Sequence, residues 1–129
     1  MDLPPVNIPK CVIQASNDYS IPVRLILAVQ RTEGGKVGMK NRNKNGTYDY
    51  GVMQINTVWL NKLKNQFKID EDMIMNDYCL SVRTAAYILR YEINLEKGNL
   101  WSGVGHYHSR TKHLKIAYIA RVYKNSLSF

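Results

Sequence analysis

Two acidic residues stand where a carboxyl group could do acid–base chemistry, and Glu33 is the first. It follows the apolar run 25–29 and precedes the pair Gly34–Gly35, which predicts a position in the last turn of a largely buried helix. Burial and the negative end of the helix dipole both raise the pKa of a carboxyl group, so Glu33 is a candidate general acid. A solvated acid at a helix end is the alternative.

The second acid, Asp49, lies among polar residues in the segment NRNKNGTYDYGVMQIN. Asn and Thr donors around a carboxylate favour its ionised form. A protonated acid opposite an ionised one is the arrangement that many glycoside hydrolases use. An aspartate in a turn also commonly bonds the nearby backbone, and this alternative stays open.

The motif YGVMQIN, residues 50–56, combines amide groups with apolar side chains. Gly51 permits a close approach of the backbone, Gln54 and Asn56 supply amide donors and acceptors, and Met53 is one of the apolar residues. A sugar-binding groove needs amides for hydroxyl and N-acetyl groups beside apolar surface for ring faces. A helix cap backed by core residues would have the same motif.

The segment GHYHS places His106 and His108 on either side of Tyr107. The H-x-H spacing invites a metal site, but no nearby cysteine or obvious carboxylate completes a ligand set. We therefore predict no metal and no other cofactor. Tyr107 follows two glycines and is a candidate ligand contact, with simple packing as the alternative.

A mainly α (α+β) chain, rich in helices with one small β element, must position these residues. We expect Ser20 to cap the second helix, with Pro22 in its first turn. The spacing of apolar residues predicts a short first helix ending near Asn17, further helices over 22–33, 54–64, 70–75 and 77–97, and a last helix after 111.

The pair Asn45–Gly46 predicts an irregular hairpin within residues 36–50. The glycine-containing segment WSGVGHYHSRT, residues 101–111, is expected to be a loop. Apolar residues at helical spacing define the expected core faces, which in the long helix are Val82, Ala85, Ala86, Leu89 and Ile93, and in the last helix Ile116, Ile119 and Ala120.

Length and composition indicate one globular domain over residues 1–129, with 1–9 as a flexible N-terminal lead. Apolar residues make up 45% of the chain and charged residues 22%, which excludes a disordered protein. No apolar run approaches the ~20 residues that cross a bilayer. The first ten residues, MDLPPVNIPK, also lack the apolar stretch of a signal peptide.

The net charge of +8 and a pI of about 9.6 favour polyanionic partners, whether nucleic acid, anionic lipid or the acidic glycans of a bacterial wall. Basic residues that only solvate helix faces would give the same balance. Because these residues are dispersed and match no known DNA-reading motif, we predict no nucleic-acid partner.

Two cysteines, Cys11 and Cys79, are too few and too far apart for a CxxC pair or a zinc cluster. We favour a disulfide between them over two buried free thiols. Such a bond would tie the first helix to the start of a late helix and stabilise the fold by about 4 kcal/mol in the chain-entropy model. It would also indicate an oxidising compartment, so we expect a periplasmic or exported protein whose leader has been removed.

Taken together, TEGG, YDYGVMQIN followed by a tryptophan, and GHYHS resemble the soluble lytic transglycosylases over about residues 10–125. The resemblance is narrower to the single-domain class that accompanies type IV and type III secretion and conjugation machines. It implies a lysozyme-like fold, peptidoglycan as substrate and Glu33 as the catalytic acid/base. It also implies that Gly51, Met53 and Gln54 line the glycan groove, and that Tyr107 contacts the substrate.

Two features depart from the common pattern of that family. Gly34 follows the acid where many members have serine, and the segment around Asp49 resembles animal-type lysozymes, in which the matching aspartate is a second catalytic carboxylate. The resemblance favours cleavage of the bond between N-acetylmuramic acid and N-acetylglucosamine with 1,6-anhydro ends, by a monomer that serves a secretion or conjugation machine. Lysozyme-type hydrolysis and a non-catalytic glycan-binding scaffold are the alternatives.

Overall fold

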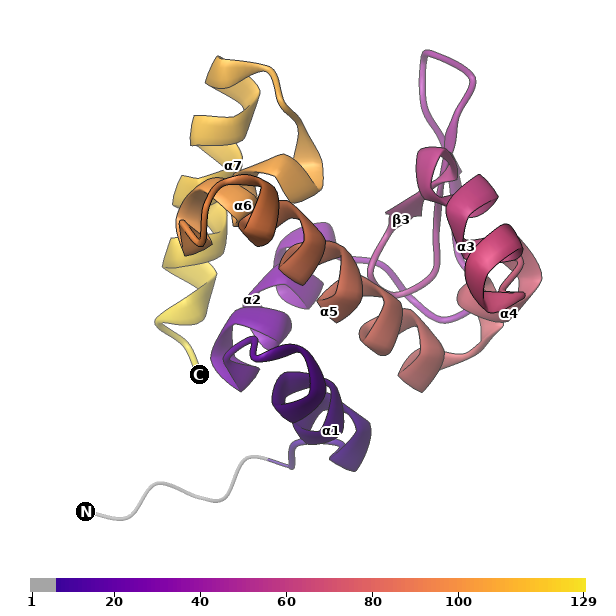
Figure 1. The fold of residues 1–129 in the computed structure, drawn as a ribbon, viewed down its shortest axis with the longest axis horizontal. Helices are drawn as coiled ribbons and strands as arrows, with labels where there is room; N and C mark the ends of the chain where they lie inside the picture. Colours follow the sequence, from indigo (N-terminus) through magenta and orange to yellow (C-terminus); the bar gives the residue numbers. More distant parts are fainter. Residues whose placement is uncertain (1–6) are drawn as a thin grey trace.

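The computed structural model describes residues 7–129, which fold into two lobes (Figure 1). Residues 1–6 of the expected lead lie outside this range, and Pro9 directly precedes the first helix. The helical lobe consists of α1 (Lys10–Tyr19), α2 (Val23–Glu33), α5 (Tyr78–Leu95), α6 (Leu100–His108) and α7 (Lys112–Ser126). The sheet lobe consists of β1 (Lys40–Arg42), β2 (Tyr48–Tyr50), β3 (Ile55–Asn56), the short 3₁₀ helix η1 (Thr57–Trp59), α3 (Leu60–Phe67) and α4 (Glu71–Asn76). This architecture confirms the prediction of a mainly α fold with a small β element.

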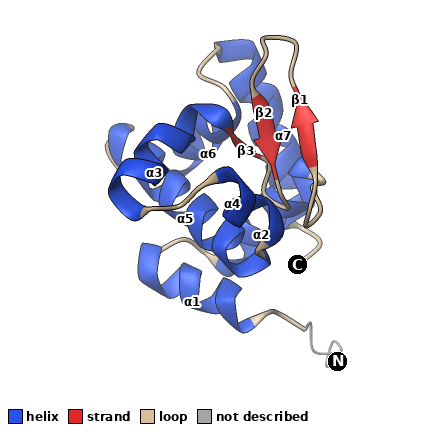
Figure 2. Cartoon of the chain, turned by 90° about the vertical axis from the view of Figure 1, so that its right-hand side faces the viewer, coloured by secondary structure: helices blue, strands red, loops and turns tan. Residues whose placement is uncertain are grey.

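The three strands form an antiparallel sheet in the order β1–β2–β3 (Figure 2). The hairpin predicted within 36–50 is β1 and β2, and Gly46 in its turn has a φ of 86° that favours glycine. Asp49 pairs with Asn41 on one side and with Asn56 on the other. The central strand thus holds the second candidate acid between two polar neighbours.

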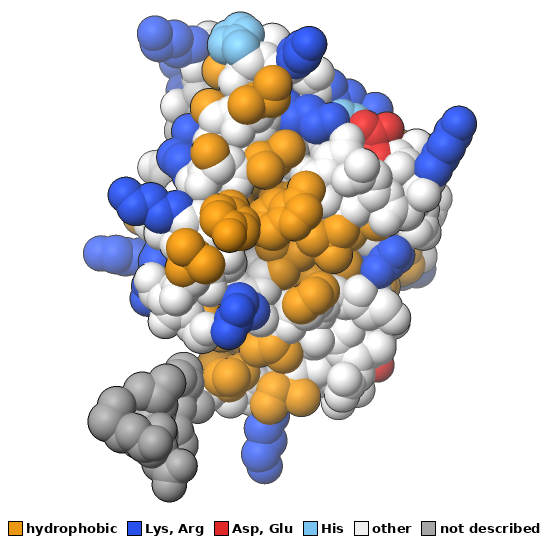
Figure 3. Space-filling view, turned by 90° about the vertical axis from the view of Figure 1, so that its left-hand side faces the viewer, with side chains coloured by type: hydrophobic (Ala, Val, Ile, Leu, Met, Phe, Trp, Pro, Cys, Tyr) orange, Lys and Arg blue, Asp and Glu red, His pale blue; other side chains and the backbone are white. Residues whose placement is uncertain are grey.

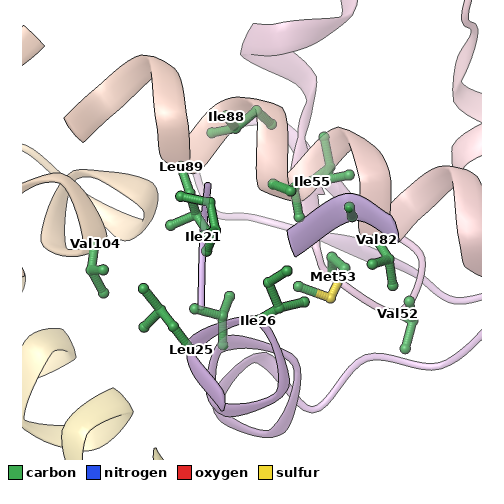
Figure 4. Packing of buried hydrophobic residues seen from close by; sticks show 14 of the residues in the cluster. Ile21, Leu25, Ile26, Val52, Met53, Ile55, Val82, Ile88, Leu89 and Val104 are labelled. Atoms are coloured by element: carbon green, nitrogen blue, oxygen red, sulfur yellow. The ribbon is translucent and has the colours of Figure 1, made fainter. Parts of the chain in front are cut away.

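The core lies where α2 and α5 meet the chain segment that follows β2 (Figure 4). Leu25 and Ile26 of α2 converge with Val52 and Met53 below α5. The core face predicted for the long helix is correct, because Val82, Ala85, Ala86, Leu89 and Ile93 are all buried. Burial of this face makes α5 the central helix, against which α1, α2 and α6 of its own lobe and α4 of the sheet lobe pack.

A disulfide joins Cys11 in α1 to Cys79 in the first turn of α5, as the sequence predicted. Arg90 of α5 adds a second tie, since its guanidinium donates to the carbonyl oxygens of Tyr19 and Ser20 at the end of α1. Both ties anchor α1 along α5, and Arg90 also supplies hydrogen bonds to carbonyl oxygens at the end of α1.

Two predicted helix starts are wrong. Ser20 does not cap α2. It ends α1 with a left-handed φ of 54°, and Pro22 itself is the N-cap residue of α2. The helix expected over 54–64 begins only at Leu60, because Gln54 has a φ of 53° and Asn56 pairs with Asp49 in the sheet. Pairing with β2 takes precedence over the helical spacing of the following apolar residues.

The segment expected to be a glycine-interrupted loop is instead helix α6. Its glycines allow close packing of helices rather than breaking the chain. A Cβ atom on Gly103 would collide with Ile93 of α5, and one on Gly105 would collide with side chains of α7. The prediction failed because the reason for these glycines lies in elements distant along the sequence.

The inward face of α7 also differs from the prediction. Ile116 is 55% exposed and Ala120 is exposed, whereas Tyr118 and Val122 are buried and Ile119 packs beside Gly105. Figure 3 shows this side of the molecule, where apolar side chains gather among scattered Lys and Arg side chains. Over residues 7–129, no helix combines the length and the apolar character needed to cross a membrane.

Candidate active site

A cleft of about 770 Å³ brings together five of the predicted site residues. Its walls include residues from both lobes. Side chains that line it are Glu33, Asp49, Gln54, Asn56 and Tyr107.

Glu33 is the last residue of α2, as predicted. Gly34 ends the helix with a φ of 65°, a left-handed conformation that costs glycine little. The Glu33 Oε2 atom accepts a hydrogen bond of 2.6 Å from the hydroxyl of Tyr118 in α7. The carboxyl group therefore lies at the end of a buried helix with one neutral donor and no ion-pair partner among the described residues.

This environment raises the pKa of Glu33 from its ordinary value of 4.5 to about 7. Burial is the largest cause, because it disfavours the charged form. The hydrogen bond from Tyr118 lowers the pKa, the negative charge of Asp49 raises it, and the positive charge of Arg121 lowers it. A carboxyl group with a pKa near neutrality can both donate and accept a proton during a reaction.

Asp49 approaches the cleft from the sheet lobe. Its Oδ1 atom accepts a hydrogen bond of 2.9 Å from the side-chain amide nitrogen of Asn56. The side-chain oxygen of Asn56 caps η1 by accepting from the backbone N–H of Val58. The amide of Asn56 also donates to the hydroxyl of Thr47 at 3.2 Å. Asn56 thus fixes the orientation of the Asp49 carboxylate.

The turn between β2 and β3 shapes the cleft through its backbone. Gln54 closes this turn with a side-chain bond to the Gly51 carbonyl at 2.9 Å, and it accepts from Asn41 at 2.8 Å. Gly51 has a φ of 72° and packs so tightly that a Cβ atom would lie 2.7 Å from the Ile74 carbonyl oxygen of α4. Gly35 packs equally tightly, since its Cβ would collide with the Gly51 carbonyl oxygen.

Met53 and Gly51 are therefore not among the residues that line the cleft. The Met53 side chain is fully buried in the core, and its carbonyl oxygen accepts a hydrogen bond of 2.7 Å from Tyr107. Tyr107 lines the cleft from α6, and burial raises its pKa well above the ordinary value. The phenol therefore stays neutral and available for hydrogen bonding at neutral pH.

Sequence analysis did not identify Tyr118, and it considered His108 only as a metal ligand and not as the neighbour of Tyr118. The two rings stack with centroids 4.8 Å apart and an interplanar angle of 7°. Burial and the positive charge of Arg121 lower the pKa of His108, which favours a neutral imidazole behind the acid. The spacing of Tyr118 and Val122 on one helix face was the available signal, and it was hidden by the more apolar Ile116 and Ile119.

Residues 91 and 92 of α5 also line the cleft. Trp59 packs edge-on against Tyr91 with centroids 5.5 Å apart, and the Lys62 ammonium lies 3.8 Å from the Tyr91 ring centre. Glu92 is paired with Arg110. Of these five residues, sequence analysis had quoted only Trp59, as the tryptophan after YDYGVMQIN, and had given it no role.

The two histidines on either side of Tyr107 contact different residues and do not form a shared metal site. His106 lies beside Glu92 and Glu96, while His108 stacks on Tyr118. Within the part of the chain that the structure describes, no three His, Cys, Asp or Glu side chains are grouped so that they could hold a metal ion.

The fold and the cleft define a class of protein, the lysozyme-like enzymes that cut glycan chains. A helical lobe faces a small antiparallel sheet, and an acid at a helix end shares the intervening cleft with a second carboxylate.

Comparison with known proteins gives the family within this class. Residues 10–124 match the family model described as "Transglycosylase SLT domain". The chain is 34% identical over 122 residues to Protein IpgF of Shigella flexneri, an alignment that spans 91% of this chain and 79% of that protein. It is 33% identical over 102 residues to Invasion protein IagB of Salmonella typhimurium strain SL1344, over 78% of this chain and 62% of that protein. The chain belongs to the SLT transglycosylase family, the lytic transglycosylases that cut peptidoglycan.

Proposed function

We propose that Glu33 is the catalytic acid/base of a reaction that cuts peptidoglycan between N-acetylmuramic acid and N-acetylglucosamine and leaves 1,6-anhydromuramic acid ends. The observation that supports it most directly is Glu33 itself, which lines a cleft of about 770 Å³ and whose pKa burial raises to about 7. A protonated acid at neutral pH is what cleavage of a glycosidic bond requires.

In the first step Glu33 gives its proton to the glycosidic oxygen, and the bond between that oxygen and C1 of the muramic acid breaks. The oxocarbenium-like centre is supported by the substrate's own N-acetyl group. In the second step the 6-hydroxyl oxygen bonds to C1, and its proton returns to the Glu33 carboxylate. Atoms balance without water, and the acid is regenerated for the next cycle.

Tyr118 suits both states of Glu33 in this scheme. Its hydroxyl donates to Oε2 at 2.6 Å and can bond the carboxylate left after proton transfer. Gln54, Asn56 and Tyr107 supply amide and phenol groups along the same cleft, and we assign them to the sugar hydroxyl and N-acetyl groups. Gly51 and Met53 act through the backbone shape of the wall.

A second candidate function is hydrolysis of the same bond, as in a lysozyme. The observation in its favour is Asp49, which lines the cleft and whose negative charge acts on Glu33. In that reaction Asp49 would stabilise the positive centre or bond to it, and water would complete the cleavage.

The experiment that separates these outcomes is mass spectrometry of sugar ends released from purified peptidoglycan. We expect fragments lighter by one water than the hydrolysed ones, carrying 1,6-anhydromuramic acid. Reducing muramic acid ends would instead establish hydrolysis. Asp49→Asn sharpens the result, because it should leave anhydro products in place but abolish a hydrolysis that needs the carboxylate.

We further propose that the enzyme works in the periplasm, where it opens the wall locally for a secretion or conjugation machine. The resemblance to Protein IpgF and Invasion protein IagB supports this assignment, and the Cys11–Cys79 disulfide fits an oxidising compartment. A strain that carries only the Glu33→Gln variant should assemble fewer envelope-spanning machines. Normal assembly in that strain would contradict this role.

A further inference from the structure

An ion pair in the wall of the cleft, formed by Glu92 and Arg110, has no part in the proposed chemistry. Glu92 lies in the middle of α5 and is only 2% exposed. Both its carboxylate oxygens accept from one nitrogen, Nη2 of Arg110, at 2.8 and 3.0 Å. Arg110 lies between α6 and α7, and its side chain is 62% exposed.

This pair holds a cation at the cleft. A buried carboxylate is costly unless it is paired, so Glu92 requires the guanidinium, and the contact in turn fixes the position of Arg110. Of the five N–H donors of an arginine, only those on Nη2 are used here. The donors on Nη1 and Nε have no hydrogen-bond partner within residues 7–129, and Arg110 lines the cleft.

Two further side chains of the cleft wall contact this pair or the residue next to it. Lys62 of α3 lines the cleft from the sheet lobe and lies over Tyr91, the residue before Glu92. The buried Nδ1 atom of His106, another lining residue, lies 3.5 Å from Oε2 of Glu92 and forms no hydrogen bond among the described residues. Lys62 and Arg110, cations from the two lobes, thus line the cleft beside adjacent residues of α5.

We propose that Arg110, positioned by Glu92 and assisted by Lys62, is a carboxylate-binding subsite for the acidic substituent of muramic acid. This inference rests on the proposed function for its substrate. Muramic acid differs from N-acetylglucosamine by a lactyl group, which ends in a carboxylate or continues as a peptide that carries carboxylates. A guanidinium with free donors binds such a group by charge-assisted hydrogen bonds. The subsite therefore selects wall strands over neutral N-acetylglucosamine polymers.

The test measures affinity with calorimetry in the Glu33→Gln background, where the saccharides are not cut. Three saccharides of equal length are compared: a muramic-acid strand with its peptides, the same strand after amidase removes the peptides, and an N-acetylglucosamine oligomer. The variant is Glu92→Gln with Arg110→Gln, which removes the cation, keeps a hydrogen-bonded pair and leaves net charge unchanged. Asp18→Asn with Arg83→Gln makes the same change at an ion pair outside the cleft.

We expect the Glu92/Arg110 double variant to bind the acidic strands about ten- to a hundredfold more weakly and the neutral oligomer as before. A loss confined to the peptide-bearing strand would place the carboxylate on the peptide, and a loss confined to the amidase-treated strand would place it on the freed lactyl group. A loss with both strands would show that the subsite binds either carboxylate. The Asp18/Arg83 control should bind all three saccharides like its parent.

Unchanged affinity for the acidic strands would overturn the subsite, as would an equal loss with all three saccharides, which indicates a structural role alone. The single variant Arg110→Lys gives an independent check, because it keeps the charge beside Glu92 but removes the guanidinium donors. It should also weaken binding of the acidic strands selectively. A parent that binds none of the saccharides would instead contradict the proposed function itself.

Discussion

Two glutamates of the same cleft are treated in opposite ways by the fold. Glu33 ends a helix, is partly exposed and receives a single hydrogen bond from a neutral phenol. Glu92 lies in the middle of a helix, is almost fully buried and is bonded by a guanidinium. The difference is the partner: Glu33 is bonded by a neutral donor and is free to hold a proton, whereas Glu92 forms an ion pair with a guanidinium.

Burial alone therefore does not mark a catalytic acid. A carboxyl group becomes a proton donor when its burial is not balanced by a cation, and it becomes a structural anchor when it is. The same cleft contains both kinds of carboxyl group, so variants of Glu33 and of Glu92 can be compared directly.

Glu33→Gln should lower the rate of peptidoglycan solubilisation by about a hundred- to ten-thousandfold, because the amide cannot donate a proton. Turbidity loss of purified wall suspensions measures this rate, and circular dichroism should show an unchanged helical fold. Glu71→Gln, an acid of α4 outside the cleft, is the matched control and should retain the parent rate. A Glu33→Gln variant that lyses walls at the parent rate would remove Glu33 from the mechanism.

Arg110→Met should reduce the free energy of unfolding by about 1–3 kcal/mol, because it leaves the buried carboxylate of Glu92 without its partner. Adding Glu92→Gln should recover most of this loss, since the neutral amide no longer needs a cation. Denaturant titration of both variants measures the effect. Arg83→Met is the control, because Asp18, the acidic partner of Arg83, is more exposed than Glu92. If Arg110→Met lowers the free energy of unfolding no more than Arg83→Met does, Glu92 does not depend on Arg110 for stability.

Glu33→Gln should also stabilise the fold at pH 8, by about 2–3 kcal/mol. The pKa of Glu33 is about 7 in the folded chain and close to 4.5 when unfolded, so between these values the folded chain binds more protons. The parent therefore loses stability as pH rises from 4.5 to 7 and stays at the lower level above that. Thermal melts at pH 4 and pH 8 should show a gain for the variant only at the higher pH.

Tyr118→Phe and Asp49→Asn should move the alkaline limb of the activity profile in opposite directions. The Tyr118 hydroxyl lowers the pKa of Glu33 and the Asp49 charge raises it. Loss of the hydroxyl should therefore extend activity to higher pH, and loss of the charge should end it at lower pH. Initial rates between pH 5 and 9 provide the check, and shifts of the same sign would show that Glu33 does not set this limb.

The parts of the site that sequence predicts are those fixed by local chemistry. Gly34 after an apolar run marks the end of the helix that carries Glu33, and Asn45–Gly46 marks the hairpin that carries Asp49. Both signals act within a few residues of the group they position. They are sufficient to place the two acids on different elements.

The missed parts depend on partners distant in sequence. Tyr118 reaches Glu33 across 85 positions, and the glycines of α6 have a purpose only beside Ile93 of α5 and the side chains of α7. The Glu92–Arg110 pair likewise joins a helix interior to a later connection. Composition and periodicity report which residues are apolar, but not which neighbour each will meet.

The tight packing at Gly35 and Gly51 has a consequence for anyone who maps this enzyme by saturation mutagenesis. Three stretches of main chain meet there with no room for a side chain, so the end of α2, the β2–β3 turn and α4 are seated directly on one another. A selection scored only by wall lysis would rank these glycines beside Glu33 as indispensable. Measuring the amount of soluble protein for each variant would separate the two cases. A substitution at either glycine removes the folded enzyme, whereas a substitution of Glu33 leaves folded protein that is inactive.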